Sequence, residues 1–294
     1  MSEAAWIEQA LKRIRAFAYA PERQKPPERP KFGLALGGGF ARGIAHLGVL
    51  RVLRENNVPI DYLAGTSVGA LVATAYAAGS PLDEIIRVGC QTRFKDFAEW
   101  TLSWQGFAAD MRLKKFLNRL TPLTRFDELR IPLAIAATDL TTAEAVYFTE
   151  GEIGPALCAS CAYPGLFRPV EVNGRTLVDG FLTAPVPVDA VRRMGAGFVI
   201  AVYLPSFSLT EKPTNLLETV SRSFSILLAH TQNIWRPLAD VTIEPDVSEF
   251  RWDDFVRTPD LVAAGERAAR AKLPHILQAL RELRPEPILE PASS

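Results

Sequence analysis

The pattern of apolar and polar positions predicts strands that alternate with helices from residue 32 onward. A short apolar strand at 32–36 precedes a helix at 44–53, and a strand at 62–64 precedes a helix at 68–78. Two such strand–turn–helix units in succession predict a parallel sheet with helices on its faces. We therefore expect an α/β fold in three layers, α/β/α, with a mostly parallel central sheet.

The rest of the chain continues this alternation. Asn173-Gly174 separates two short apolar runs and predicts a hairpin with a type I′ turn. The other predicted elements are strands at 133–138, 145–149, 198–204 and 241–243 and helices at 188–194, 216–235 and 261–283. No linker-like gap divides residues 32–283, so we expect a catalytic core at 32–205 and, within the same domain, a C-terminal helical extension at 206–294.

Residues 1–31 are expected to form an N-terminal appendage. Apolar residues from Trp6 to Phe17 recur at helical spacing, but charged residues interrupt them, so this is not a secretory signal. The amphipathic helix either docks on the main domain or rests on a membrane surface. Residues 21–31 then form a proline-rich linker. The uncharged run at 62–82 is long enough to cross a bilayer, but its many small residues favour a strand, a turn and a buried helix instead.

Composition narrows the class of protein. Of the 294 residues, 48% are apolar and 22% charged, which is typical of a well-packed globular protein and not of a disordered one. The 33 basic and 33 acidic side chains cancel, which argues against a nucleic-acid partner. Three cysteines do not make a disulfide scaffold. We expect a cytoplasmic protein, with peripheral membrane contact as an option.

The sharpest local motif is Gly65-Thr66-Ser67-Val68-Gly69, a G-x-S-x-G between a predicted strand and a predicted helix. Such a turn holds its serine in a strained backbone conformation, and glycine is needed on both sides because a side chain there would collide with the neighbouring chain. The helix directs backbone N–H groups at the serine, which favours an anionic intermediate. The motif indicates Ser67 as a nucleophile, against the alternative of a chance loop sequence.

A glycine loop, Gly37-Gly38-Gly39-Phe40-Ala41-Arg42-Gly43, also joins a strand to a helix. It lacks the third glycine of a dinucleotide fingerprint and the Lys-Ser/Thr of a P-loop. The remaining interpretation is an oxyanion hole, in which backbone amides of Gly37, Gly38 and Gly39 face an oxygen that becomes negative. Arg42 either strengthens this field, binds a phosphate, or pairs structurally with a surface carboxylate.

The histidines do not supply an evident base for Ser67. His46, His230 and His275 each lie in a predicted helix, and none belongs to a catalytic motif. The alternative is a carboxylate that activates the serine directly.

At this point the chain resembles the bacterial patatin-like phospholipases, a family related to plant patatins, cytosolic phospholipase A2 and the neuropathy target esterase domain. The resemblance covers about residues 32–205, and its motifs occur in the family's order. They are Gly37-Gly38-Gly39-x-x-Arg42-Gly43, Gly65-x-Ser67-x-Gly69, Ala159-Ser160-x-Ala162-x-Pro164-Gly165-x-Phe167-x-Pro169-Val170 and Leu177-Val178-Asp179-Gly180.

The resemblance implies a Ser–Asp dyad, with Ser67 as nucleophile and Asp179 as general base, and an oxyanion hole from the backbone of residues 37–39. The residues themselves agree on Asp179, which follows a predicted strand and precedes Gly180, where the backbone can approach closely; the alternative is an exposed turn aspartate. The supporting residues of the site would be Arg42, Gly43, Gly65, Gly69 and Gly180.

Two positions depart from the family. Phe181 stands where Gly or Ala is usual, and Ala184 stands where Asn is often found. We expect Phe181 to narrow the pocket and Ala184 to loosen the loop that holds Asp179.

Two other features bear on cofactors and substrate. Cys158-Ala159-Ser160-Cys161 is a lone C-x-x-C, and zinc would need a second pair of ligands, so we predict buried thiols, no metal site and no cofactor. Aromatic residues at 94–107 indicate either an apolar wall or lid over the site, or ordinary packing of a cap helix.

Together these motifs predict a lipid acyl hydrolase of the phospholipase A, lysophospholipase or carboxylesterase type. Its substrate would be a fatty-acyl ester or phospholipid, cleaved through an acyl-enzyme. Two alternatives remain: a catalytically idle lipid- or acyl-binding protein on the same fold, and a Ser-His-Asp hydrolase in which His275 is the only late histidine. With a net charge of zero, transient membrane contact would depend on the N-terminal helix and the aromatic stretch.

Overall fold

The computed structural model describes residues 29–91, 123–205 and 216–283. Residues Pro30–Glu282 group into one compact unit. The predicted N-terminal helix and the aromatic stretch at 94–107 lie outside the described residues, and the predicted boundary at residue 205 stays a prediction.

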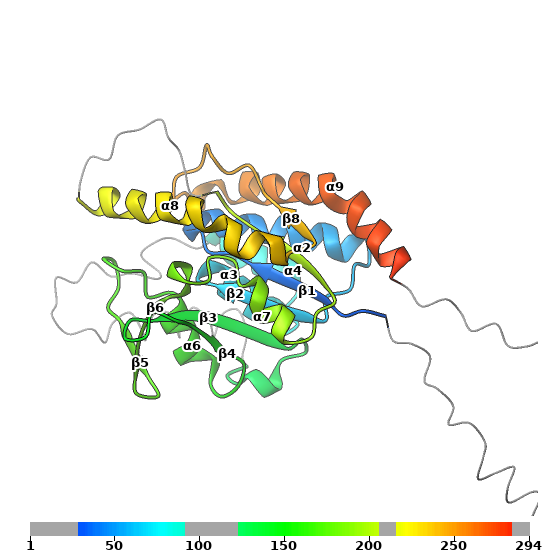
Figure 1. Cartoon of the computed structure of the whole chain (residues 1–294). Helices are drawn as coiled ribbons and strands as arrows, with labels where there is room; N and C mark the ends of the chain where they lie inside the picture. Colours follow the sequence, from blue (N-terminus) through cyan, green and yellow to red (C-terminus); the bar gives the residue numbers. More distant parts are fainter. Residues whose placement is uncertain (1–28, 92–122, 206–215, 284–294) are drawn as a thin grey trace, which may run out of the picture. The chain divides into compact units, whose positions relative to one another are not determined.

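One eight-stranded sheet forms the centre of this unit, in the order β5-β6-β3-β2-β1-β7-β8, and β4 also pairs with β3 (Figure 1). The pairs β1–β2, β1–β7, β2–β3 and β7–β8 are parallel, whereas β3–β4, β3–β6 and β5–β6 are antiparallel. The strands are β1 (Phe32–Leu36), β2 (Tyr62–Thr66), β3 (Leu133–Asp139), β4 (Ala145–Phe148), β5 (Val170–Val172), β6 (Arg175–Asp179), β7 (Phe198–Val202) and β8 (Val241–Ile243). The predicted α/β class with a mostly parallel sheet is confirmed.

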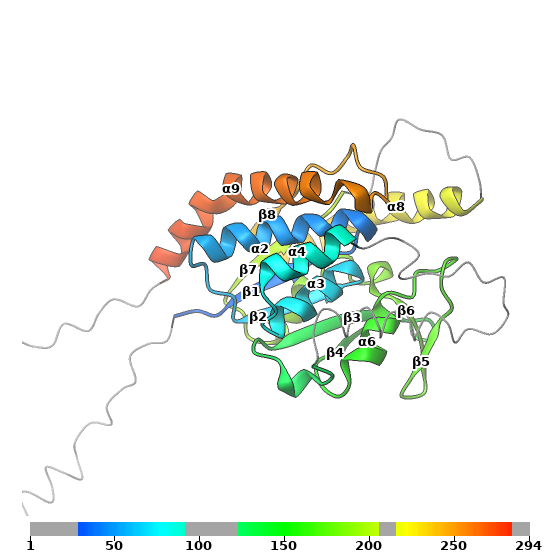
Figure 2. The ribbon, with the colours of Figure 1, turned by 180° about the vertical axis from the view of Figure 1, so that it is seen from behind.

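Helices cover both faces of the sheet. Helix α7 lies over one face (Figure 1), and α2, α3, α4 and α9 lie on the opposite side, seen from behind in Figure 2. The α-helices are α2 (Ala45–Glu55), α3 (Val68–Ala77), α4 (Leu82–Gln91), α6 (Ile153–Ser160), α7 (Val188–Arg193), α8 (Leu216–Trp235) and α9 (Thr258–Glu282). Short 3-10 turns occur at η1 (Phe40–Ile44), η3 (Phe126–Glu128), η4 (Gly180–Leu182), η5 (Arg236–Leu238) and η6 (Phe255–Arg257).

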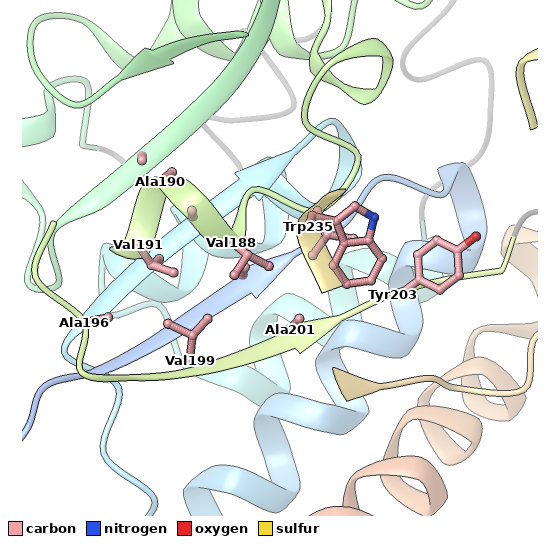
Figure 3. Packing of buried hydrophobic residues seen from close by; sticks show 12 residues of the cluster. Val188, Ala190, Val191, Ala196, Val199, Ala201, Tyr203 and Trp235 are labelled. Atoms are coloured by element: carbon pink, nitrogen blue, oxygen red, sulfur yellow. The ribbon is translucent and has the colours of Figure 1, made fainter. Parts of the chain in front are cut away.

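The two faces of the sheet carry side chains of different size. Small residues of the strands, such as Ala35 and Ala64, pack in one cluster with Val188 and Val191 of α7 (Figure 3). Because successive side chains of a strand point to opposite faces, the larger Leu34 of β1 faces the other helices. Small strand residues therefore let α7 approach the sheet closely.

Local structure follows the predictions with two additions. Asn173 and Gly174 have φ of 50° and 74°, which confirms the predicted turn of the β5–β6 hairpin. Helices α4 and α6 were not predicted. Helix α6 is buried on several sides, so its apolar residues do not recur with the period of an amphipathic helix.

Helices α2 and α9 approach each other at two glycines. A Cβ on Gly48 would overlap the carbonyl oxygen of Val262, and a Cβ on Gly265 would overlap that of Ala45. This contact holds α9 on α2, the helix that follows the glycine loop.

We therefore expect Gly265→Ala to lower the free energy of unfolding by roughly 1–3 kcal/mol, because the added methyl group overpacks the helix contact. Urea denaturation of the whole chain measures it. The matched control is Gly154→Ala in α6, where an added Cβ meets no atom within 4 Å. That variant should be neutral or gain up to about 1 kcal/mol from helix propensity. Equal losses in the two variants would contradict the close contact.

Candidate active site

Ser67 lies in the turn between β2 and α3, and its backbone has φ 55° and ψ −123°. A positive φ at a residue other than glycine is strained and must be held by its surroundings. A Cβ on Gly65 would overlap backbone atoms of Ala70, and a Cβ on Gly69 would overlap the carbonyl oxygen of Leu36. The prediction that both flanking positions need glycine is therefore confirmed.

Strand β3 brings the end of β2 to the end of β6. Thr66 of β2 pairs with Ala136, and Asp179 of β6 pairs with the next residue, Ala137. Strand β4 pairs with residues of β3 that also pair with β2 or with β6, so β4 must lie along the opposite edge of β3. Strands β2 and β6 therefore share one edge of β3. Because β2 runs parallel to β3 and β6 runs antiparallel, their C-terminal ends meet head to head. This meeting places Asp179 beside Ser67.

The carboxyl group of Asp179 is buried and hydrogen-bonded. Its Oδ1 accepts from the Phe181 N–H at 3.0 Å, and the group is also hydrogen-bonded with the Ser67 side chain. Burial raises the pKa of Asp179 from 3.8 to about 7, and the hydrogen bonds from Phe181 and Ser67 oppose that rise. A carboxyl group that titrates near neutral pH can accept a proton from Ser67 and return it.

Buried threonine hydroxyls tie the segment after Asp179 to neighbouring strands. Thr66 Oγ1 donates to the Ala184 carbonyl at 2.7 Å, and Thr138 Oγ1 donates to the Asp179 carbonyl at 3.1 Å. The Ala184 N–H donates to the Gly180 carbonyl at 2.8 Å. Backbone groups of Ala184 therefore hold the loop, and the loosening expected from the missing Asn side chain stays a prediction.

Two more of the predicted glycines allow close approach. A Cβ on Gly180 would overlap the carbonyl oxygen of Ala136 in β3, and a Cβ on Gly43 would overlap the side chain of Val68 at the start of α3. Side chains at these positions would push the base segment and the glycine loop away from the nucleophile turn.

The glycine loop lies next to Ser67, since a Cβ on Gly38 would be 3.6 Å from the Ser67 Cβ. The Gly37 N–H, however, donates to the Val202 carbonyl at 3.0 Å. It extends the β1–β7 ladder by one residue and is therefore not free to face a substrate oxygen. The expectation that all three glycine amides contribute to an oxyanion hole is corrected for Gly37.

The other two amides of the loop differ from each other. The Gly38 N–H donates to the Pro185 carbonyl at 3.2 Å, close to the limit of a normal hydrogen bond. The Gly39 N–H makes no backbone hydrogen bond to the residues that the structure describes. Gly38 and Gly39 are therefore the candidates for oxyanion donors.

His46 supports this loop. Its Nε2 lies 2.8 Å from the Gly37 carbonyl oxygen, which can only accept, so Nε2 carries the proton. Burial lowers the pKa of His46 to about 4, so the ring is neutral at physiological pH. His230 and His275 are exposed on α8 and α9. No contact between a histidine and Ser67 or Asp179 is found, so the Ser-His-Asp alternative gains no support.

In the part of the chain that the structure describes, Arg42 binds backbone carbonyls and not the expected surface carboxylate; a stronger oxyanion field and phosphate binding stay predictions. The Arg42 Nε donates to the Phe250 carbonyl at 3.0 Å and its Nη1 approaches the Pro205 carbonyl at 3.5 Å. The partners are backbone carbonyls of two distant segments, and not a surface carboxylate. Arg42 thus ties the glycine loop to the chain around Pro205 and Phe250.

An aromatic cluster includes Phe181, whose N–H donates to Asp179, and sequence analysis did not find this cluster. Phe181 is buried and stacks on Tyr163 with ring centroids 4.8 Å apart, and Phe224 of α8 meets the Phe181 ring edge-on at 5.5 Å. The Tyr163 ring also contacts Phe40, and Phe40 contacts Trp252. These residues come from five segments, so no local pattern could reveal them. The expected narrowing of the pocket by Phe181 stays a prediction.

The C-terminal end of α6 contacts the nucleophile. Ser67 N–H donates to Ser160 Oγ at 2.9 Å, and the side chains of Ser67 and Cys161 are hydrogen-bonded. Burial and the nearby Asp179 raise the pKa of the Cys161 thiol well above its usual range, so it stays protonated. Cys158 and Cys161 are half-buried, whereas the sequence predicted buried thiols. Among the described residues, no three His, Cys, Asp or Glu side chains gather as metal ligands would.

The chain matches the family model described as patatin-like phospholipase over residues 34–192. An uncharacterized NTE family protein of Mycobacterium tuberculosis is 34% identical over 202 residues, which cover 64% of this chain and 52% of that protein. Lysophospholipase NTE1 of Mycosarcoma maydis is 31% identical over 230 residues, which cover 74% of this chain and 12% of that protein. This chain therefore spans about half the length of the mycobacterial relative.

A solved structure supports the fold. The crystal structure of VipD from Legionella pneumophila matches with a TM-score of 0.55 at 14% identity, over 87% of this chain and 67% of that one. At this identity the likeness concerns the fold alone. No described helix is both long enough and apolar enough to cross a membrane.

The buried Asp179 carboxyl predicts a pH-dependent stability. Its pKa is about 7 in the folded protein and 3.8 in the reference state, so the unfolded chain loses this proton first as pH rises. The contribution of Asp179 therefore destabilises the fold increasingly from about pH 4 to pH 7. Asp179→Asn removes this penalty, so the melting temperature of the variant should rise relative to wild type between pH 5 and pH 8.

Thermal unfolding at several pH values measures this difference. The control is Gly154→Ala, which changes no titratable group; its difference from wild type should stay flat with pH. A flat difference for Asp179→Asn as well would contradict the raised pKa.

Proposed function

The chain belongs to the patatin-like phospholipase family, and we propose that it is a lipid acyl hydrolase that cleaves fatty-acyl esters through a dyad of Ser67 and Asp179. One observation carries the proposal: the hydroxyl of a serine on a strained turn is hydrogen-bonded with a buried carboxyl group whose pKa lies near 7. The name of a relative, lysophospholipase, agrees with this class of reaction.

In the proposed reaction the ionised Asp179 accepts the Ser67 hydroxyl proton while Ser67 Oγ attacks the ester carbonyl carbon. The tetrahedral intermediate collapses, the alcohol leaves with the proton from Asp179, and an acyl-enzyme remains. A water molecule then gives its proton to Asp179 and attacks the acyl carbon. Ser67 recovers its proton and the fatty acid is released.

The negative charge of both intermediates forms on the former carbonyl oxygen. We assign its stabilisation to the Gly39 amide, which makes no backbone hydrogen bond to the described residues, and to the Gly38 amide, whose bond to Pro185 is long at 3.2 Å; the Gly37 and Ser67 amides donate within the protein over 3.0 Å and 2.9 Å. The N-terminal end of α3 adds a favourable dipole at the same place. His46 supports the donors indirectly through its bond to the Gly37 carbonyl.

The aromatic cluster supports an apolar acyl group as the substrate's reacting part. Phe181, whose N–H donates to Asp179, stacks on Tyr163, and Phe224 of α8 meets the Phe181 ring edge-on. Helix α8 also exposes Ile226 and Leu227, which is consistent with transient contact at a lipid surface. Membrane contact and a cytoplasmic location stay predictions, as does the choice among phospholipid, lysophospholipid and simpler esters.

A catalytically idle acyl-binding protein is the second candidate. Phe181 favours it, because this large, buried side chain occupies a position where the family usually has Gly or Ala. The two candidates differ in whether Ser67 is reactive.

We expect Ser67→Ala and Asp179→Asn each to lower kcat/KM for p-nitrophenyl acyl esters by on the order of a thousandfold or more, because the two residues act as one unit. His275→Ala serves as the control and should retain full activity. A fluorophosphonate probe should label wild type and not Ser67→Ala. Full activity in both dyad variants would rule out the dyad, and an unlabelled wild type would favour the idle protein.

The pH profile tests the base separately. Asp179 must be ionised to accept the Ser67 proton, and its pKa is raised to about 7. We expect kcat/KM to rise with pH, to reach half its maximum near pH 7, and to level off above that. Initial rates between pH 5 and pH 9, with wild-type folding checked at each pH, measure the profile. Rates that are already constant from pH 5 upward would mean that Asp179 is not the group that titrates.

A further inference from the structure

The backbone amide of Ser67 has an unusual partner. It donates to the hydroxyl oxygen of Ser160 at 2.9 Å, and Ser160 is fully buried as the last residue of α6. The two residues are far apart in sequence, so this bond joins α6 to the nucleophile turn. The first N–H groups of a helix have no carbonyl partner within the helix. At the start of α3, the Ser67 N–H finds its partner in a residue outside the helix.

This bond acts on a strained residue. Ser67 keeps φ at 55°, a conformation that relaxes when the surrounding structure does not hold it. The Ser160 hydroxyl fixes the amide of the strained residue itself. It therefore sets the direction in which the Ser67 side chain leaves the backbone.

The same short segment also holds the base. Two residues after Ser160, the Ala162 carbonyl accepts from the Asp179 N–H at 3.0 Å. One turn of chain, residues 160–162, therefore bonds to the backbone amides of both Ser67 and Asp179. Its rigid geometry determines how far apart the nucleophile and the base stand.

We propose that Ser160 is a positioning residue, which holds Ser67 at hydrogen-bonding distance from Asp179 through the nucleophile's backbone amide. Ser160 acts through Ser67 and does not touch the substrate. This inference rests on the proposed acyl hydrolysis.

The test compares Ser160→Ala, which removes the acceptor, with Ser160→Thr, which keeps a hydroxyl oxygen. The matched control is Thr74→Val, because Thr74 is a fully buried residue of α3 whose hydroxyl bonds only to the Ala70 carbonyl of its own helix. Ser160→Ala should lower kcat by roughly ten- to a hundredfold and leave KM within about twofold, since misplacement of a reacting group costs rate. Ser160→Thr and Thr74→Val should keep most of the wild-type kcat.

A second measurement does not depend on activity. Exchange of the Ser67 amide hydrogen, followed by NMR, should be faster in Ser160→Ala than in wild type and unchanged in Thr74→Val. Melting temperatures of all variants show whether each is folded.

The outcomes separate the two proposals. Wild-type kcat and wild-type exchange in Ser160→Ala would overturn the positioning role, and so would an equal loss of kcat in Thr74→Val. A wild type that neither hydrolyses esters nor reacts with fluorophosphonate would overturn the proposed function. Faster exchange of the Ser67 amide in Ser160→Ala would still support the hydrogen bond between Ser67 and Ser160.

Discussion

Two strands that meet end to end along one edge of β3 determine where the candidate site forms. Strand β2 ends at Thr66 and β6 ends at Asp179, and these residues pair with consecutive positions of β3. A shift of either strand by one residue would turn its side chains to the other face of the sheet. The Ser67 hydroxyl and the Asp179 carboxyl can therefore meet only if both strands pair with β3 in this register.

Close backbone approach is the second constraint, and it explains the glycines. Gly65, Gly69 and Gly180 each lie where a Cβ would overlap main-chain atoms of a neighbouring segment. This packing holds Ser67 in a backbone conformation that an isolated chain would avoid. The Ser67 N–H donates to Ser160 Oγ and the Thr66 hydroxyl donates to the Ala184 carbonyl, so contacts from separate elements hold the strained turn.

Burial then decides which groups carry charge. Asp179 is desolvated enough to titrate near neutral pH, whereas the His46 ring and the Cys161 thiol stay neutral for the same reason. One carboxyl group is thus left as the titrating group beside Ser67. The aromatic stack of Tyr163 and Phe181 lies next to this carboxyl and contributes to its apolar surroundings.

The sequence by itself determined the local features of this protein. Alternation of apolar runs predicted the α/β order, Asn173-Gly174 predicted the hairpin turn, and G-x-S-x-G predicted the strained serine turn, because each signal lies within a few residues. Family motifs pointed to Asp179. Only the tertiary structure decided that Gly37 donates within the β1–β7 ladder, that Arg42 binds backbone carbonyls, and that Ser160 holds the nucleophile. These contacts join segments that are far apart in the chain. Strand register and packing determine them, and no local sequence pattern encodes strand register or packing.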